Sequence, residues 1–179
     1  MGILIFGDSY VAAADRGRPG YARIAPLLML SKGEYMGLGG TGFVRTNGDR
    51  PAYAGRLPAL LAREAGTVIV QATGNDALSD LSTVAAATRD FLTVTAARFP
   101  RVIVLGPMWA KDGAGNLSAL RDLTARTCAE LGIEFIDALG WLSPRLIGPD
   151  GAHPTWLGHA VIAARLARAV RRSSKTPRR

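Results

Sequence analysis

The amino-acid sequence predicts an α/β protein, a three-layer α/β/α sandwich around a five-stranded parallel sheet. Segments with helical periodicity alternate with short strand-like segments along the whole chain. The strand-like segments are continuous apolar runs, as at residues 67–71, rather than alternations of polar and apolar residues. Strands of this kind are buried on both faces, which is what a parallel sheet covered by helices requires.

The predicted elements follow one another in a regular order. Strands are expected at residues 2–6, 34–38, 67–71, 101–105 and 133–136, and helices at residues 21–31, 57–65, 80–99, 117–131 and 155–172. Gly74 breaks the chain after the third strand, and Gly106 stops the fourth. Ser79 or Asp80 is expected to cap the long third helix, and Pro26 is tolerable only near the first turn of its helix.

The composition predicts one globular domain. The chain has 179 residues, of which 48% are hydrophobic and 20% are charged, and this is enough for one sizeable core. It contains neither an internal repeat nor an interdomain linker. We assign residues 1–172 to the domain and residues 173–179 to a basic, flexible tail.

The net charge of +8 is concentrated at the C-terminal end. From Arg165 onward the chain has seven basic residues and no acidic ones, which leaves only about +1 for the rest of the domain. The charge therefore belongs to the C-terminal end of the chain, in the tail and just before it, and does not predict a basic face for nucleic acid. The sequence leaves the oligomeric state open.

The sequence predicts neither a membrane span nor a secretory signal. No uninterrupted apolar run approaches the roughly 20 residues that cross a bilayer. Met1 and Gly2 lead directly into the first strand, without a basic region or a cleavage site, so a cytoplasmic location is expected. The single cysteine, Cys128, cannot form an internal disulfide, which fits a reducing compartment.

Polar residues and glycines follow the predicted strands, where the carboxyl ends of parallel strands meet at one edge. Ligands bind at this edge in open α/β sheets. The residues concerned are Ser9 after the first strand, Gly39 and Gly40 after the second, Asn75 after the third, Trp109 after the fourth, and Asp150 and His153 after the fifth. Their convergence predicts a functional site there.

A serine, a histidine and an aspartate at one edge predict nucleophilic catalysis. Ser9 needs a base to remove its proton, and the chain has two histidines, His153 and His159, that could serve. Asp150 precedes His153 by three residues in a loop rich in glycine and proline, a spacing at which its carboxylate can reach the imidazole.

Acyl transfer also needs hydrogen-bond donors for the oxyanion. Three candidates lie at the same edge: the backbone N–H groups of Ser9 and Gly40, and the side-chain amide of Asn75. Wall positions around such a site are expected for Tyr10, Met108, Trp109 and Trp156.

In this order, four segments resemble the sequence blocks of the SGNH hydrolase superfamily, also called the GDSL esterase/lipase family. The segments are Gly7-Asp8-Ser9, Gly37-Leu38-Gly39-Gly40-Thr41, Gly74-Asn75-Asp76 and Asp150-Gly151-Ala152-His153-Pro154. The resemblance implies that His153 rather than His159 is the base, that Asp150 orients it, and that Ser9, Gly40 and Asn75 hold the oxyanion. It implies no metal and no cofactor. Tyr10 and Tyr35 depart from the family pattern without removing a catalytic group.

The function expected from these residues is hydrolysis of carboxylic esters through an acyl-enzyme. A compact chain favours short acyl groups such as O-acetyl, so the natural partner is expected to be a small-molecule or carbohydrate ester. Two alternatives stay open: a lipase, lysophospholipase or thioesterase acting on longer acyl chains, and a binding module on the same fold without turnover. Packing or capping is expected for His159, hydrogen bonding within the loops for Asp8 and Asp76, and a buried thiol for Cys128.

Overall fold

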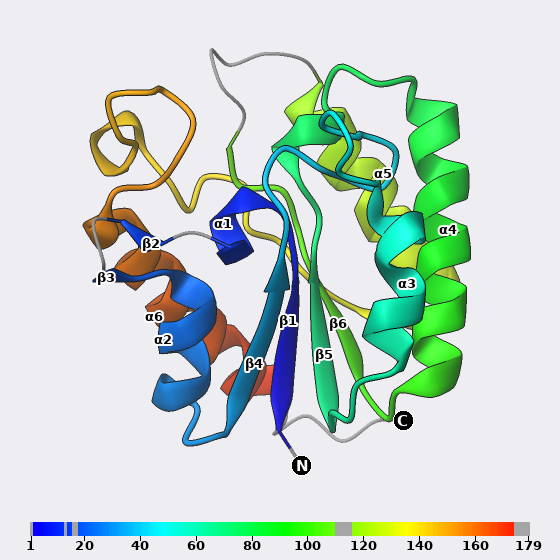
Figure 1. The fold of residues 1–179 in the computed structure, drawn as a ribbon, viewed down its shortest axis with the longest axis horizontal. Helices are drawn as coiled ribbons and strands as arrows, with labels where there is room; N and C mark the ends of the chain where they lie inside the picture. Colours follow the sequence, from blue (N-terminus) through cyan, green and yellow to red (C-terminus); the bar gives the residue numbers. More distant parts are fainter. Residues whose placement is uncertain (1, 13, 16–17, 110–115, 174–179) are drawn as a thin grey trace.

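A computed structural model of the chain describes residues 2–12, 14–15, 18–109 and 116–173. Its centre is a five-stranded parallel sheet in the order β4-β1-β5-β6-β7 (Figure 1). The strands are β1 (Ile3–Gly7), β4 (Gly33–Gly37), β5 (Thr67–Gln71), β6 (Val102–Leu105) and β7 (Glu134–Ile136). The prediction of a parallel α/β/α sandwich is confirmed, and every predicted strand is present within two residues of its expected bounds.

Helices cover both faces of the sheet, as Figure 1 shows. One layer consists of α2 (Tyr21–Leu28) and α6 (Trp156–Ser173), and the other of α3 (Tyr53–Leu61), α4 (Leu81–Arg98) and α5 (Leu117–Glu130). Asp80 caps α4 by accepting a hydrogen bond from the N–H of Thr83, 2.8 Å away. None of the helices in the described segments is long and apolar enough to span a bilayer.

The two faces of the sheet bury separate apolar clusters. Side chains of successive strand residues point to opposite faces, so Ile5 packs with α2 and α6 while Leu4 and Phe6 pack with α3 and α4. Both clusters are fully buried along β5 and β6. This two-sided burial explains why the strands read as continuous apolar runs.

Several local expectations were wrong. The second predicted helix begins at Tyr53 rather than at residue 57, because the buried Tyr53 ring packs against Phe6 and anchors an earlier turn. Pro26 lies inside α2, beyond its first turn, and packs against Gly33, where an added Cβ would stand 2.5 Å from the proline ring. Proline has no backbone N–H, so α2 lacks one hydrogen bond at Pro26, and the packing of the ring against Gly33 compensates for this loss. Ser173, assigned to the tail, is the last residue of α6, and residues 174–179 lie outside the described residues.

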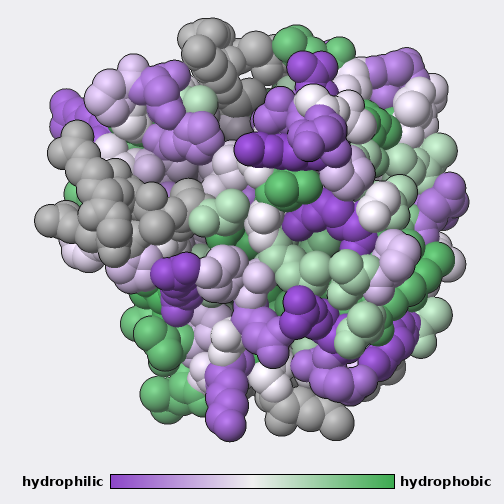
Figure 2. Space-filling view, viewed as in Figure 1, coloured by the Kyte–Doolittle hydropathy of each residue, from purple (hydrophilic) through white to green (hydrophobic). Residues whose placement is uncertain are grey.

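Small elements without a sequence signal complete the fold. They are α1 (Ser9–Ala12), a short antiparallel pair formed by β2 (Ala14–Asp15) and β3 (Arg18–Pro19), and two 3-10 turns, η1 (Gly74–Asp76) and η3 (Pro144–Leu146). The far end of α2 leaves Leu27, Leu28 and Leu30 exposed, and Figure 2 shows hydrophobic surface over this helix.

Candidate active site

Ser9 is the first residue of α1, directly beyond the carboxyl end of β1. The start of α1 and the end of β5 can pack closely against Gly7 because this residue has no side chain. An added Cβ would stand 2.7 Å from Val11 and 2.9 Å from Gln71. The backbone N–H of Ser9 therefore points out of a helix N-terminus and has no intrahelical acceptor.

Asp8, next to Ser9, is buried and organises the loops around it. One carboxylate oxygen accepts the N–H of Tyr10 at 2.9 Å, and the other accepts the hydroxyl of Thr73 and the amide of Asn75, the latter at 3.3 Å. Burial raises the pKa of Asp8 above its ordinary value, while the hydrogen bonds from Thr73 and Tyr10 oppose the rise. The expected role of Asp8 as a hydrogen-bond acceptor within the loops is confirmed.

Gly39 and Gly40 form a turn beside Ser9. Gly40 has a φ of +75°, and an added Cβ would lie 2.4 Å from Nδ2 of Asn47. The Gly39 carbonyl accepts hydrogen bonds from Asn47 Nδ2 at 3.1 Å and Arg50 Nη1 at 3.3 Å. Because this carbonyl and the Gly40 N–H belong to one trans peptide unit, fixing the carbonyl also fixes the N–H, which points the opposite way.

Asn75 lies in η1, at the carboxyl end of β5. Thr73 caps this turn by accepting the Asn75 N–H at 3.1 Å. The Asn75 amide donates to the Thr41 carbonyl at 2.9 Å as well as to Asp8 at 3.3 Å. The buried carboxylate of Asp76 accepts backbone N–H groups from residues 43–45, the shortest at 2.7 Å, as expected for a turn carboxylate. These bonds join the turn at Asn75 to the loop after β4.

Asp150 and His153 are in direct contact. Oδ2 of Asp150 lies 2.6 Å from Nδ1 of His153, and Oδ1 accepts the N–H groups of Ala152 and His153, both at 3.0 Å. The backbone and side-chain hydrogen bonds from His153, followed by the one from Ala152, hold the pKa of Asp150 well below its ordinary value. An ionised carboxylate therefore faces the imidazole, and both side chains are about half exposed.

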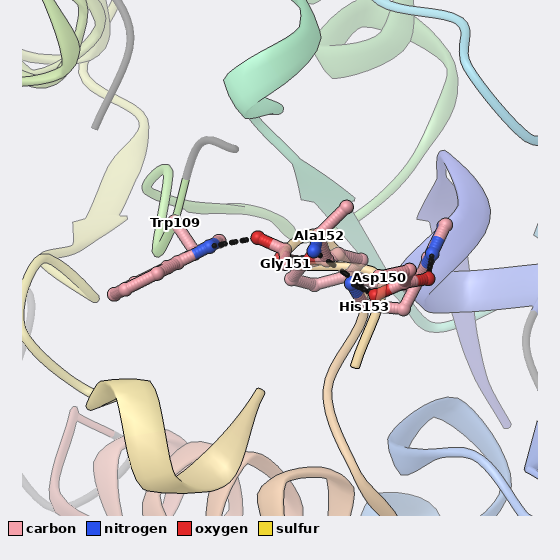
Figure 3. Close-up of polar contacts among 6 residues, drawn as sticks. Trp109, Asp150, Gly151, Ala152 and His153 are labelled. Atoms are coloured by element: carbon pink, nitrogen blue, oxygen red, sulfur yellow. Dashed lines mark hydrogen bonds and ion pairs between the residues drawn. The ribbon is translucent and has the colours of Figure 1, made fainter. Parts of the chain in front are cut away.

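Two aromatic side chains hold the loop that carries this pair. The indole N–H of Trp109 donates to the Gly151 carbonyl at 3.0 Å (Figure 3), and the Tyr10 hydroxyl donates to the Ala152 carbonyl at 2.6 Å. The ring centroid of Tyr10 lies 6.2 Å from that of His153. The loop is also closed on itself, since the N–H of Gly148 donates to the His153 carbonyl at 2.7 Å.

These segments line one cavity of about 620 Å³. The structure brings together the sequence-predicted residues Ser9, Gly40, Asn75, His153, Tyr10, Met108 and Trp109 in its wall. Trp156, predicted beside them, is not among the lining residues and lies exposed in the first turn of α6. Asp150 is not a lining residue either and reaches the cavity through His153.

Four residues of the segment between β4 and α3, which the sequence did not predict for the site, also line the cavity: Arg45, Thr46, Asn47 and Arg50. One signal was available. Asn47 and Arg50 form an isolated β-bridge around Gly48 and Asp49, and a Gly-Asp pair is typical of a tight hairpin turn.

His159 lies apart from this cavity. Its Nδ1 accepts the N–H of Tyr21, the first residue of α2, at 3.3 Å, and the two rings stack with 15° between their planes. Gly20, the N-cap residue of α2, has no side chain to do this. The expectation of a packing or capping role is confirmed. Within the described ranges, no group of three or more His, Cys, Asp or Glu side chains is arranged to hold a metal ion.

Comparison with known proteins identifies the family. Residues 5–161 match the model of the GDSL-like lipase/acylhydrolase family, so the chain belongs to that family. A GDSL lipase of Mycobacterium tuberculosis is 32% identical over 71 residues, which are 37% of this chain and only 31% of that relative.

Solved structures share the whole fold. LAE5, an alpha/beta hydrolase enzyme from the metagenome of Lake Arreo in Spain, superposes with a TM-score of 0.77 at 18% identity and covers 94% of both chains. Axe2, an acetylxylan esterase from Geobacillus stearothermophilus, superposes with a TM-score of 0.75 at 16% identity, over 94% of this chain and 93% of its own. Together with the family match, these structures confirm the SGNH-type fold.

Proposed function

We propose that this protein is a serine esterase that hydrolyses short-acyl carboxylic esters, including O-acetyl esters, through Ser9, His153 and Asp150. One observation carries the proposal. The 2.6 Å contact between Asp150 and His153 lies in a loop whose histidine lines the same cavity as Ser9 and Gly40. A carboxylate, an imidazole and a helix-N-terminal serine around one cavity form the arrangement that acyl transfer requires.

In the proposed reaction, Ser9 is the nucleophile and His153 the base. The Asp150 carboxylate holds the proton on Nδ1 of His153, which leaves Nε2 with a lone pair for the Ser9 hydroxyl. His153 takes this proton as Oγ attacks the ester carbonyl, and then gives it to the departing alkoxide. Water hydrolyses the acyl-enzyme with the same base. The mechanism uses neither a metal nor an organic cofactor.

The proposed oxyanion donors are the N–H groups of Ser9 and Gly40 and the amide of Asn75. Among the described residues, neither backbone N–H donates to another group. The Asn75 amide has two acceptors, of which Asp8 is the more distant at 3.3 Å. A bond to the oxyanion would replace this longer contact.

The lining of the cavity supports short acyl groups. Its apolar members include Ala77, Leu78, Met108 and Trp109, but polar and charged side chains form most of the rest. Axe2 is named an acetylxylan esterase, and its structures include catalytic mutants with a serine or an aspartate replaced by alanine. The Mycobacterium tuberculosis relative is named a lipase, so longer acyl chains are the alternative to test.

The test is hydrolysis of 4-nitrophenyl acetate and 4-nitrophenyl octanoate by the wild type, Ser9→Ala and Ser31→Ala. Ser31 is a matched control, since it precedes β4 at the amino ends of the strands, away from the cavity, and its exposed hydroxyl donates a hydrogen bond to the Lys32 carbonyl. We expect Ser9→Ala to lose roughly a thousandfold or more in kcat. Equal activity in all three proteins would refute the role of Ser9.

Chain length decides between the substrate classes. A rate maximum at acetate supports the short-acyl esterase, whereas a maximum at eight carbons or longer favours a lipase or thioesterase. Ester binding without turnover by the folded wild type would favour the binding module.

A further inference from the structure

We infer that the ester recognised by this protein carries a carboxylate, which Arg45 and Arg50 bind at the wall of the cavity. The inference rests on the proposed esterase function and names the chemical class of its substrate. Both arginines line the cavity that Ser9 and His153 also line, and both side chains are exposed to it rather than buried in the core.

Arg50 lies next to the proposed nucleophile. A Cβ placed on Gly39 would stand 3.2 Å from Nη1 of Arg50 and 3.6 Å from Cβ of Ser9. The guanidinium and the serine therefore flank the same backbone position. When an ester binds with its carbonyl at Ser9, the Arg50 guanidinium lies beside either its acyl group or its alcohol group.

The backbone around Arg50 is fixed by a tight turn. Asn47 and Arg50 exchange two backbone hydrogen bonds of 3.1 and 3.0 Å, and Gly48 between them has a φ of +60°. The bond from Arg50 Nη1 to the Gly39 carbonyl uses one of five N–H donors of the guanidinium. In the part of the chain that the structure describes, no other hydrogen bond uses the remaining donors, which can therefore serve a ligand in the cavity.

Arg45 supplies the second charge. Its backbone N–H is held by Asp76 at 3.0 Å, which fixes where the side chain leaves the loop. Within the described part of the chain, its guanidinium makes no hydrogen bond and no ion pair. Asp76 attracts it only at longer range.

Among the residues that the structure describes, no carboxylate neutralises these two arginines at close range. Asp8 is buried with donors on both oxygens, and Asp150 is paired with His153. Asp49, the neighbour of Arg50, does not line the cavity, and no ion pair in the described segments includes either arginine. Guanidinium groups match the planar, two-oxygen geometry of a carboxylate, so a carboxylate on the substrate completes the pairing.

The first measurement is binding, which does not depend on turnover. Calorimetry with the Ser9→Ala protein compares 4-acetoxybenzoate with its neutral methyl ester. We expect tighter binding of the anion, weakened about tenfold by a further Arg45→Gln or Arg50→Gln substitution and weakened by added salt. Arg126→Gln, which removes the same charge from an exposed position on α5, is the control and should change nothing.

The second measurement is hydrolysis by proteins that retain Ser9. The ratio of kcat/KM for the anionic and the neutral ester is compared between the wild type and the arginine variants. Replacing Arg50 also removes its hydrogen bond to the Gly39 carbonyl, which can lower the activity towards every ester. The ratio of kcat/KM for the two esters does not change with such a general loss. A parallel pair, mono-4-nitrophenyl adipate and 4-nitrophenyl hexanoate, puts the carboxylate on the acyl side instead of the alcohol side.

The outcomes separate this inference from the proposed function. Ser9-dependent hydrolysis with no anion preference on either side, or with a preference that both arginine variants keep, overturns the inference and leaves the esterase intact. Arginine-dependent binding of the anion without hydrolysis supports the inference and counts against the esterase. Failure of 4-acetoxybenzoate and of the adipate ester to bind more tightly than their neutral partners also overturns it.

Discussion

The indole N–H of Trp109 donates to the carbonyl oxygen of Gly151 over 3.0 Å, so a residue just past β6 holds the loop that carries His153. Tyr10 acts on the same loop from α1, through the 2.6 Å bond from its hydroxyl to the Ala152 carbonyl. Two strand ends therefore determine where the proposed base stands. Both aromatic residues act on His153 through the backbone and are positioning residues.

Removing either hydrogen bond should lower kcat more than it changes KM. We expect Tyr10→Phe and Trp109→Phe each to reduce kcat about tenfold, because a displaced imidazole costs transition-state geometry. Steady-state kinetics with 4-nitrophenyl acetate measures the change in kcat and the change in KM separately. Trp156→Phe is the matched control, since Trp156 does not line the cavity. A rise in KM alone would show that these residues only form a wall.

The proposed oxyanion turn should not tolerate a side chain. Gly40→Ala brings a Cβ to 2.4 Å from Nδ2 of Asn47 and strains a φ of +75°, so we expect a loss of at least a hundredfold in kcat. Gly132→Ala imposes the same kind of strain at a φ of +66°, but in open space after α5. It should lower the melting temperature while kcat stays within about twofold. Similar kcat losses in both variants would argue against an oxyanion role.

Replacing the carboxylate of Asp150 tests its partnership with His153. Asp150→Asn should lower kcat by roughly ten-thousandfold, since the amide no longer holds the required tautomer. Asp49→Asn, in an exposed loop position outside the cavity wall, is the control. Because the folded pKa of Asp150 is depressed, its contribution to loop stability is present above the ordinary value of 3.8 and is lost only as pH falls through the lower folded pKa.

Stability should fall at alkaline pH. Burial raises the pKa of Cys128 from 9.0 to about 12 and that of Tyr53 well above 10.0. The unfolded chain releases these protons first, so stability is complete below about pH 9 and decreases above it. Urea unfolding between pH 8 and 10.5 measures the slope, which Tyr53→Phe should reduce. An unchanged slope in Tyr53→Phe would contradict this assignment.

The sequence was sufficient for the sheet because its strands are buried on both faces, and residues 67–71 could hardly form anything else. The convergence of Ser9, Gly40, Asn75 and His153 on one cavity followed from strand order alone. The start of α3 at Tyr53 could not be predicted from the sequence, since it depends on where the buried Tyr53 ring packs.

Contacts made by side chains to distant backbone groups were also beyond sequence reasoning. Trp109 was expected as a wall residue, and its bond to Gly151 depends on how two loops meet. Arg45 and Arg50 lie in a stretch without periodicity, and the Gly-Asp pair before Arg50 indicates a tight turn but not which way the arginines face. His159 is an intermediate case: α2 has glycine as its N-cap residue, which signals that another part of the chain must supply the acceptor.

The pairing of Asp150 with His153 is local, within a small closed loop, whereas Ser9 lies near the beginning of the chain. A ribosome therefore makes the proposed nucleophile and all three oxyanion donors well before it makes the base. A nascent chain that ends before residue 150 has the proposed nucleophile and oxyanion donors but no base to activate the serine. In the order of synthesis, the proposed hydrolytic activity therefore has to wait until the loop beyond β7, which carries Asp150 and His153, has been made.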